Sequence, residues 1–135
     1  KKKTIIIAVS IVVIAVLAFA IREGVRVSRY KKKAESTSIE SIDISQIQDG
    51  VYQGEYDLDY VYAAVSVSVK AGKIEQIAIQ KHKHGRGAEA EKEIPKRIKD
   101  QQSVQVDVVS GATNSSKAIM KAVEVALKKG YTKSE

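Results

Sequence analysis

Hydrophobic and polar positions divide the chain into an apolar N-terminal block and a patterned C-terminal region. Residues 4–21 carry no charge and lie between Lys1–Lys3 and Arg22. This run is long enough for one membrane-spanning helix, and its apolar residues surround the helix, which argues against a helix of a soluble core. A signal peptide is the alternative, because Ala18-Phe19-Ala20 resembles a cleavage site, but the length of the run favours an uncleaved anchor.

The rest of the chain predicts a polar linker followed by one small domain. Residues 1–33 form the anchor with its basic flanks, residues 34–48 are polar with isolated isoleucines, and the domain is expected over residues 49–130. Strands are expected at Val51–Tyr56, Tyr60–Lys70, Ile74–Gln80 and Val104–Val109, and helices at Ala88–Lys99 and Lys117–Lys129. The order predicts an α+β fold: a small, mostly antiparallel sheet with two helices, preceded by one transmembrane helix.

Local signals support several of these elements. Val65, Val67 and Val69 alternate with serines, as in a strand with one buried face. Gly72 offers the positive φ of a tight hairpin turn between the second and third strands. Pro95 is expected in the first turn of its helix, or else to break that helix.

Charge is concentrated beside the apolar block. Residues 1–48 hold nine Lys or Arg against four acids, whereas residues 49–135 hold fourteen against twelve. This distribution favours anionic lipid headgroups over nucleic acid. The larger basic flank after residue 21 and the short basic N-terminus predict opposite membrane orientations, so charge alone leaves the orientation open. The absence of cysteine excludes disulfides, thiolate metal sites and thiol catalysis.

The segment Ser110-Gly111-Ala112-Thr113 joins the last expected strand to the last expected helix. Gly111 permits a sharp turn, and Asn114, Ser115 and Ser116 are residue types that cap helix starts. Unsatisfied backbone N–H groups and the positive end of the helix dipole favour a phosphate beside the Thr113 hydroxyl. Considered without the rest of the domain, this segment could also be only a turn and a helix start that bind no ligand.

Together, several motifs resemble the FMN-binding domain family. Residues 107–116 look like its flavinylation motif, and Asp49-Gly50-Val51-Tyr52-Gln53-Gly54 is similar to its opening segment. Residues 67–74 resemble the family's central hairpin, after which the family often has a histidine. Gln102-Ser103, ahead of Asp107, also resembles the family's sequence. The family includes FMN-carrying subunits of sodium-translocating NADH:quinone reductase and of Rnf complexes, and this chain resembles its small membrane-linked members.

The resemblance implies a covalent cofactor. In the family, a flavin transferase takes FMN from FAD and esterifies it to the second hydroxyl residue of the motif, which is Thr113 here. The residues expected to bind the cofactor are Thr113, Ser110, Gly111, Ala112, Asp107, Ser115, His84 and Tyr52. Asp107 would bind a metal during flavin transfer or orient the turn. Tyr52 is one of four tyrosines that could border the flavin ring. The cations of residues 81–86 would favour the reduced anionic form of the flavin.

No resident metal is expected, because His82 and His84 share a strand face but lack a third ligand nearby in the sequence. The implied function is that of a membrane-anchored electron carrier, in preference to a stand-alone enzyme. Its FMN domain is expected on the extracytoplasmic side. Its expected partners are a flavin transferase, a membrane quinone or quinone-linked dehydrogenase, an extracytoplasmic electron acceptor and membrane lipids, but no nucleic acid. The alternatives are a tethered adaptor module without covalent flavin, or a reductase with noncovalent FMN.

Overall fold

The N-terminal unit is a single long helix. The computed structural model describes residues 1–131, which fall into two compact units that meet near residue 35. Helix α1 (Lys2–Ser36) contains the expected apolar run, and its large apolar side chains from Ile5 to Ile21 are each more than half exposed. It is long and apolar enough to cross a membrane. The helix also continues through the basic flank into the beginning of the predicted linker.

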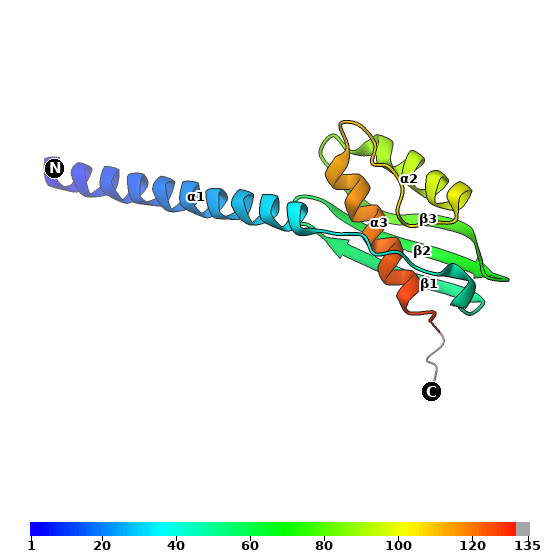
Figure 1. Ribbon diagram of the computed structural model, residues 1–135. Helices are drawn as coiled ribbons and strands as arrows, with labels where there is room; N and C mark the ends of the chain where they lie inside the picture. The colour runs from blue at the N-terminus through cyan, green and yellow to red at the C-terminus, as the bar shows by residue number, and fades with distance from the viewer. Residues whose placement is uncertain (132–135) are drawn as a thin grey trace. The chain divides into compact units, whose positions relative to one another are not determined.

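The second unit contains a three-stranded antiparallel sheet. Strands β1 (Gly50–Asp57), β2 (Tyr62–Lys70) and β3 (Lys73–Lys83) pair in sequence order, with β2 in the centre (Figure 1). Both residues at the tip of the β2–β3 hairpin have positive φ, 51° at Ala71 and 71° at Gly72. This is the turn type that matches the twist of paired strands, so the predicted hairpin is confirmed.

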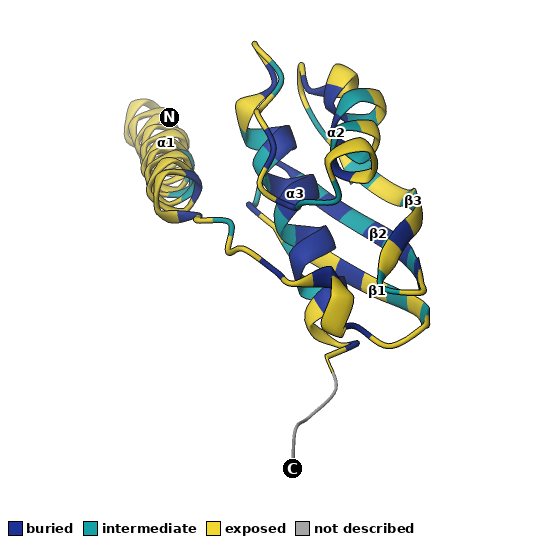
Figure 2. Cartoon of the chain, turned by 45° about the vertical axis from the view of Figure 1, so that its right-hand side comes forward, coloured by how far each residue is buried: buried dark blue, intermediate teal, exposed yellow. Residues whose placement is uncertain are grey.

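Two helices cover one face of the sheet. Helix α3 (Thr113–Lys128) packs on β1 and β2, and helix α2 (Ala88–Gln101) packs on α3 and β3. The side chains of Val65, Val67 and Val69 are at most 2% exposed beneath them, whereas the serines between them are only half-buried. Figure 2 shows the buried residues gathered along α3 and the sheet face toward it. The predicted α+β fold is confirmed.

The predicted fourth strand does not form. Residues 104–109 carry no strand pairing and run as an extended segment between α2 and α3 (Figure 1). Val104 and Val106 are nevertheless buried, at 1% and 8% exposed. The alternation of Val104 and Val106 therefore reflects burial of every second side chain, and it does not require the backbone to pair in a sheet.

Helix α2 differs from the expectation at Pro95. The proline lies in the interior of Ala88–Gln101, and the helix continues through it. An interior proline removes a hydrogen bond and costs about 3 kcal/mol. Ile94 and Ile98 are fully buried on either side of it, and burying such side chains contributes about 1.5–3 kcal/mol each. Packing of the helix therefore offsets the local cost.

Gly54 brings β1 unusually close to α3. A Cβ atom added at Gly54 would overlap the carbonyl oxygen of Ala122 and lie 2.5 Å from the backbone nitrogen of Ala126. Both neighbours are backbone atoms of a helix, so neither can move aside alone. The motif glycine at this position is therefore required by packing.

The segment that the sequence suggested to be a linker packs on the domain. Ile42, Ile44 and Ile47 are at most 8% exposed, and the compact unit begins at Ser36. Backbone groups of the segment also form hydrogen bonds to the domain, such as Gln48 N–H to the Gly130 carbonyl at 2.9 Å. The isoleucines therefore belong to the core.

A buried carboxylate on α3 fixes this segment. The Glu124 side chain is 1% exposed, accepts a 3.0 Å hydrogen bond from the backbone N–H of Glu40, and pairs with Lys121 and Lys128 at 2.8 and 2.7 Å. Burial raises the pKa of Glu124, but the hydrogen bonds from Lys121, Lys128 and Glu40 outweigh it, so the net pKa lies below the ordinary value. The charged form is therefore favoured in the folded domain.

Candidate functional site

The turn expected to hold the acceptor hydroxyl is exposed. Gly111 has a φ of 78° and open space around it. Glycine is therefore favoured at this position by the positive φ of the turn and not by close packing. Helix α3 begins at Thr113, whose side chain is exposed, and the cap residue Ala112 supplies no side-chain hydrogen bond. The first turn of α3 therefore presents a hydroxyl beside N–H groups that the cap residue does not satisfy.

Ser116, one of the expected capping residues, has another role. Ser116 is fully buried, and its Oγ accepts a 3.0 Å hydrogen bond from the backbone N–H of Val109. Its own N–H donates to the Ala112 carbonyl at 2.8 Å. Ser116 thus ties the segment before the turn to the helix after it, instead of capping the helix start.

An arginine on α2 holds the same segment from the other side. Arg97 donates from Nη1 to the carbonyl oxygens of Asp107 at 2.9 Å and Val108 at 3.4 Å. The Asp107 and Ser110 side chains themselves are exposed. The backbone before the turn is therefore anchored while its polar side chains face solvent.

Ser115 and His84 meet at Gly87. A Cβ atom at Gly87 would overlap Ser115 Oγ, lie 2.5 Å from Ser115 Cβ and 3.4 Å from His84 Cβ. Gly87 precedes α2, and Ser115 is 3% exposed in the first turn of α3. The structure thus brings His84 and Ser115 together beside the start of α3, with Ser115 buried in the contact.

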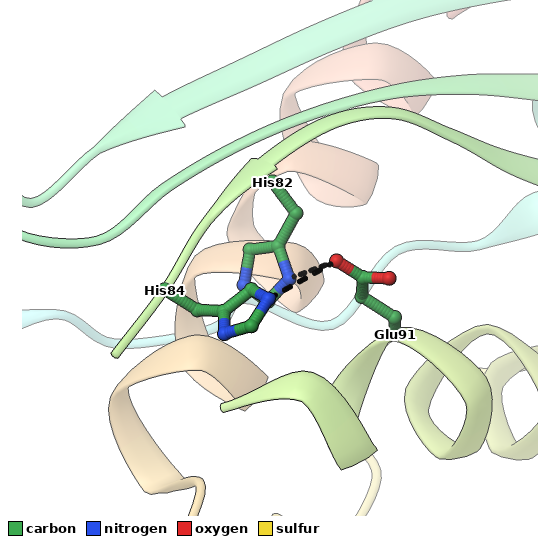
Figure 3. Close-up of side chains that lie close together, drawn as sticks. All are labelled: His82, His84 and Glu91. Atoms are coloured by element: carbon green, nitrogen blue, oxygen red, sulfur yellow. Dashed lines mark hydrogen bonds and ion pairs between the residues drawn. The ribbon is translucent and has the colours of Figure 1, made fainter. Parts of the chain in front are cut away.

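Two histidines and a glutamate cluster next to this contact. His82 Nδ1 lies 2.8 Å from Glu91 Oε1, and His84 Nε2 lies 3.7 Å from the same oxygen (Figure 3). The two imidazole rings are 4.7 Å apart between centroids. Burial lowers the pKa of His82, and this effect exceeds the opposite one of its hydrogen bond to Glu91. The view that the histidines lack a third ligand is therefore wrong, because α2 supplies Glu91.

Tyr52 lies away from these residues. Its hydroxyl donates to the Gln48 carbonyl at 2.8 Å, and its ring lies against Gly130, just beyond the C-terminal end of α3. Thr113 is at the opposite end of that helix, about 22 Å away at 1.5 Å per residue. The structure does not bring Tyr52 together with Thr113.

Sequence reasoning missed Glu91, Arg97 and Gly87. Nothing near Glu91 in the sequence marks it, because only the packing of α2 against β3 places it beside the histidines. A glycine directly before a helix was the signal for Gly87, since small residues allow close approach. Nothing local in the sequence marks Arg97.

The comparisons with known proteins agree with this geometry. The FMN-binding domain family matches residues 58–128, more than half of the chain, which include β2, β3, both domain helices and the turn before α3. The opening segment at Asp49–Gly54 lies before the matched residues.

Among solved structures, the crystal structure of the CPE2226 protein from Clostridium perfringens is similar, with 26% sequence identity and a TM-score of 0.53. The match covers 62% of this chain and 88% of that protein. No curated protein gives a significant match. On the family match, with the fold in agreement, the chain belongs to the FMN-binding domain family.

Proposed function

We propose that the chain is a membrane-anchored electron carrier whose FMN is joined to Thr113 by a phosphoester. The observation that carries the proposal is the position of Thr113: an exposed hydroxyl at the first residue of α3, directly after a glycine turn, in an FMN-binding domain. A transferase needs access to the hydroxyl oxygen, and this position offers it. The family supports FMN as the cofactor, and the covalent link and the electron relay are our proposals.

The residues at the start of α3 fit a phosphate. A phosphodiester retains one negative charge, and a helix N-terminus stabilises an anion by about 0.3–1 kcal/mol where exposed. The cap residue Ala112 makes no side-chain hydrogen bond to the helix start, which is where a phosphate would be bound.

Attachment exchanges a phosphoanhydride bond of FAD for a phosphoester bond to the chain, with AMP as the leaving group. The Thr113 oxygen forms a bond to the flavin-side phosphorus of FAD, the bond from that phosphorus to AMP breaks, and the hydroxyl proton is released. When bound, FMN supplies one- and two-electron redox chemistry. The chain positions that group, and the covalent link prevents its loss outside the cytoplasm. Ser110 is exposed near the acceptor and would donate to the phosphate, and exposed Asp107 would serve the transfer step.

Helix α1 supports the membrane part of the proposal. Its apolar run has the length and composition of a single span, and basic residues flank it at both ends. We place the FMN domain on the extracytoplasmic side, from its resemblance to small membrane-linked members of the family. Electrons would then pass from a membrane quinol or quinone-linked dehydrogenase to an acceptor outside.

The decisive experiment tests the ester bond. The full chain is produced together with a flavin transferase, denatured, and examined for flavin fluorescence and for an added mass of FMN less one water. Thr113→Val should lose both signals. Thr113→Ser, which keeps the hydroxyl, should retain them.

Two outcomes would overturn the proposal. One is a wild-type chain without covalent flavin under conditions where the transferase modifies a known substrate, which would favour an adaptor module. The other is flavin that is released on denaturation, which would favour noncovalent binding. Covalent flavin that persists in Thr113→Val would move the attachment to another residue.

A further inference from the structure

Three metal-ligand side chains converge where β3 ends and α2 begins. His82 lies in the penultimate position of β3, His84 follows the strand, and Glu91 lies in the first turn of α2. One ligand atom from each can be chosen so that all three lie within 4.8 Å of one another. Figure 3 shows both imidazole rings turned toward the same carboxylate oxygen.

The neighbouring cations of β3 face elsewhere. Strand alternation places Lys81 and Lys83 on the opposite face from His82. Lys83 Nζ lies 3.4 Å from the Asp59 carbonyl oxygen, and Lys81 Nζ lies 5.7 Å from the centre of the Tyr62 ring. Arg86 is exposed on the following loop. The sequence Lys-His-Lys-His therefore does not surround the imidazoles with positive charge.

The hydrogen bond of His84 leaves a lone pair facing the carboxylate. His84 Nδ1 lies 3.2 Å from the Gly85 carbonyl oxygen, which can only accept, so Nδ1 carries a proton. In the neutral ring Nε2 is then an acceptor, yet it lies 3.7 Å from Glu91 Oε1, another acceptor. Two facing acceptors repel unless a proton or a metal ion lies between them, and a carbonyl partner on the other ring nitrogen is typical of metal-bound histidines.

His82 is the buried member of this cluster. Its side chain is fully buried, and within the described residues its Nε2 has no hydrogen-bond partner. The unpartnered Nε2 is not the atom that faces Glu91; Nδ1 faces Glu91, so only Nδ1 of His82 is placed to bind a metal with this carboxylate.

We propose that His82 Nδ1, His84 Nε2 and the Glu91 carboxylate bind one divalent transition-metal ion of the zinc class, with the fourth position open to water. Two imidazoles and a carboxylate with an open position are a known donor set for zinc. A tetrahedral ion with bonds of about 2.1 Å separates its ligands by roughly 3.4 Å. The present separations from Glu91 Oε1 are 2.8 and 3.7 Å, and the three ligand atoms lie within 4.8 Å of one another, so binding requires side-chain shifts of up to about 1.4 Å.

The test measures metal binding directly, without flavin. The full chain in detergent, free of any affinity tag and produced without a flavin transferase, is titrated with Co²⁺ at pH 7.5. We expect the visible absorption bands of tetrahedral Co²⁺ at one equivalent, and their loss on addition of Zn²⁺. Because no flavin is present, failure of this test would not bear on Thr113, and failure at Thr113 would not bear on this site.

Matched variants identify the ligands. His84→Ala and Glu91→Gln should weaken Co²⁺ binding at least about 100-fold, since loss of a supporting partner alone costs 10–100-fold. Glu89→Gln changes an exposed acid in the same turn of α2 and should bind Co²⁺ like the wild type. Circular dichroism checks that each variant is folded. The proposal is overturned if the folded wild type gives no tetrahedral bands, or if Glu89→Gln and Glu91→Gln bind Co²⁺ equally.

Discussion

Substituting Gly87 tests the contact between the starts of α2 and α3. The backbone of Gly87 has a φ of −96°, which alanine adopts without strain, so Gly87→Ala adds only volume. The new methyl group would overlap Ser115 Oγ and lie 2.5 Å from Ser115 Cβ. Restoring an ordinary carbon–carbon distance near 3.5 Å requires a shift of about 1 Å between two helix starts.

The expected cost follows from overpacking. Extra methyl groups in a tight core cost about 1–3 kcal/mol, and this contact involves two rigid elements, so we expect about 2–3 kcal/mol for Gly87→Ala. In a domain of this size, 1 kcal/mol lowers Tm by about 4–8 °C, so the fall should be roughly 10–20 °C. Gly85→Ala is the matched control, because an added Cβ at Gly85 meets no atom within 4 Å.

A double-mutant cycle assigns the cost to Ser115. Ser115→Gly removes both clashing atoms, at a cost in helix propensity of up to about 1 kcal/mol. Gly87→Ala should then cost less in the Ser115→Gly background, with a coupling of about 1–2 kcal/mol. Thermal unfolding of the full chain in detergent, followed by circular dichroism, provides the measurement. Equal losses for Gly85→Ala and Gly87→Ala, or additive effects of Gly87→Ala and Ser115→Gly, would refute the reasoning.

Three further substitutions test other contacts. Gly54→Ala should cost more than about 3 kcal/mol in denaturant unfolding, because the added Cβ meets helix backbone; a near-neutral effect would contradict the close approach. Glu124→Gln should destabilise the domain above pH 5 and less at lower pH. The pKa of Glu124 in the folded domain lies below the ordinary 4.5, so the stabilisation from the carboxylate is lost as pH falls through that folded pKa. Unfolding free energies of the wild type and the variant, measured from pH 3 to 7, check the direction of this change. Arg97→Met should speed hydrogen exchange of residues 107–109 with a stability loss of about 1 kcal/mol; unchanged exchange would refute its role in holding them.

Local patterns in the sequence were sufficient to predict the sheet. The valines of β2 alternate because one face is buried, and Gly72 allows the hairpin that joins β2 to β3. The same alternation at Val104 and Val106 predicted a strand that does not form. Burial of alternate side chains is a local property, whereas a strand needs a partner edge, which the pattern does not reveal.

Contacts between distant segments were not predictable from local composition. The isoleucines of residues 42–47 are isolated among polar residues, and their burial depends on Glu124, some eighty positions later, holding the backbone at Glu40. Glu91 likewise meets the histidines only because α2 folds back on β3. For the candidate site, the sequence therefore predicted the turn before α3 and His84, but not Arg97 and Glu91 of α2, which lie against them.

The structure gives separate physical reasons for three residues of the turn and helix start at residues 110–116. Gly111 is needed for its positive φ, since the space around it is open. Ser116 is needed inside the fold, where it binds the Val109 N–H. Thr113 is exposed and contributes an accessible hydroxyl. If Thr113 is the acceptor, only its contribution is chemical, and Ser116 acts by fixing the backbone that a transferase must recognise. Ser116→Ala should then impair flavin attachment although the Ser116 side chain is inaccessible to the enzyme.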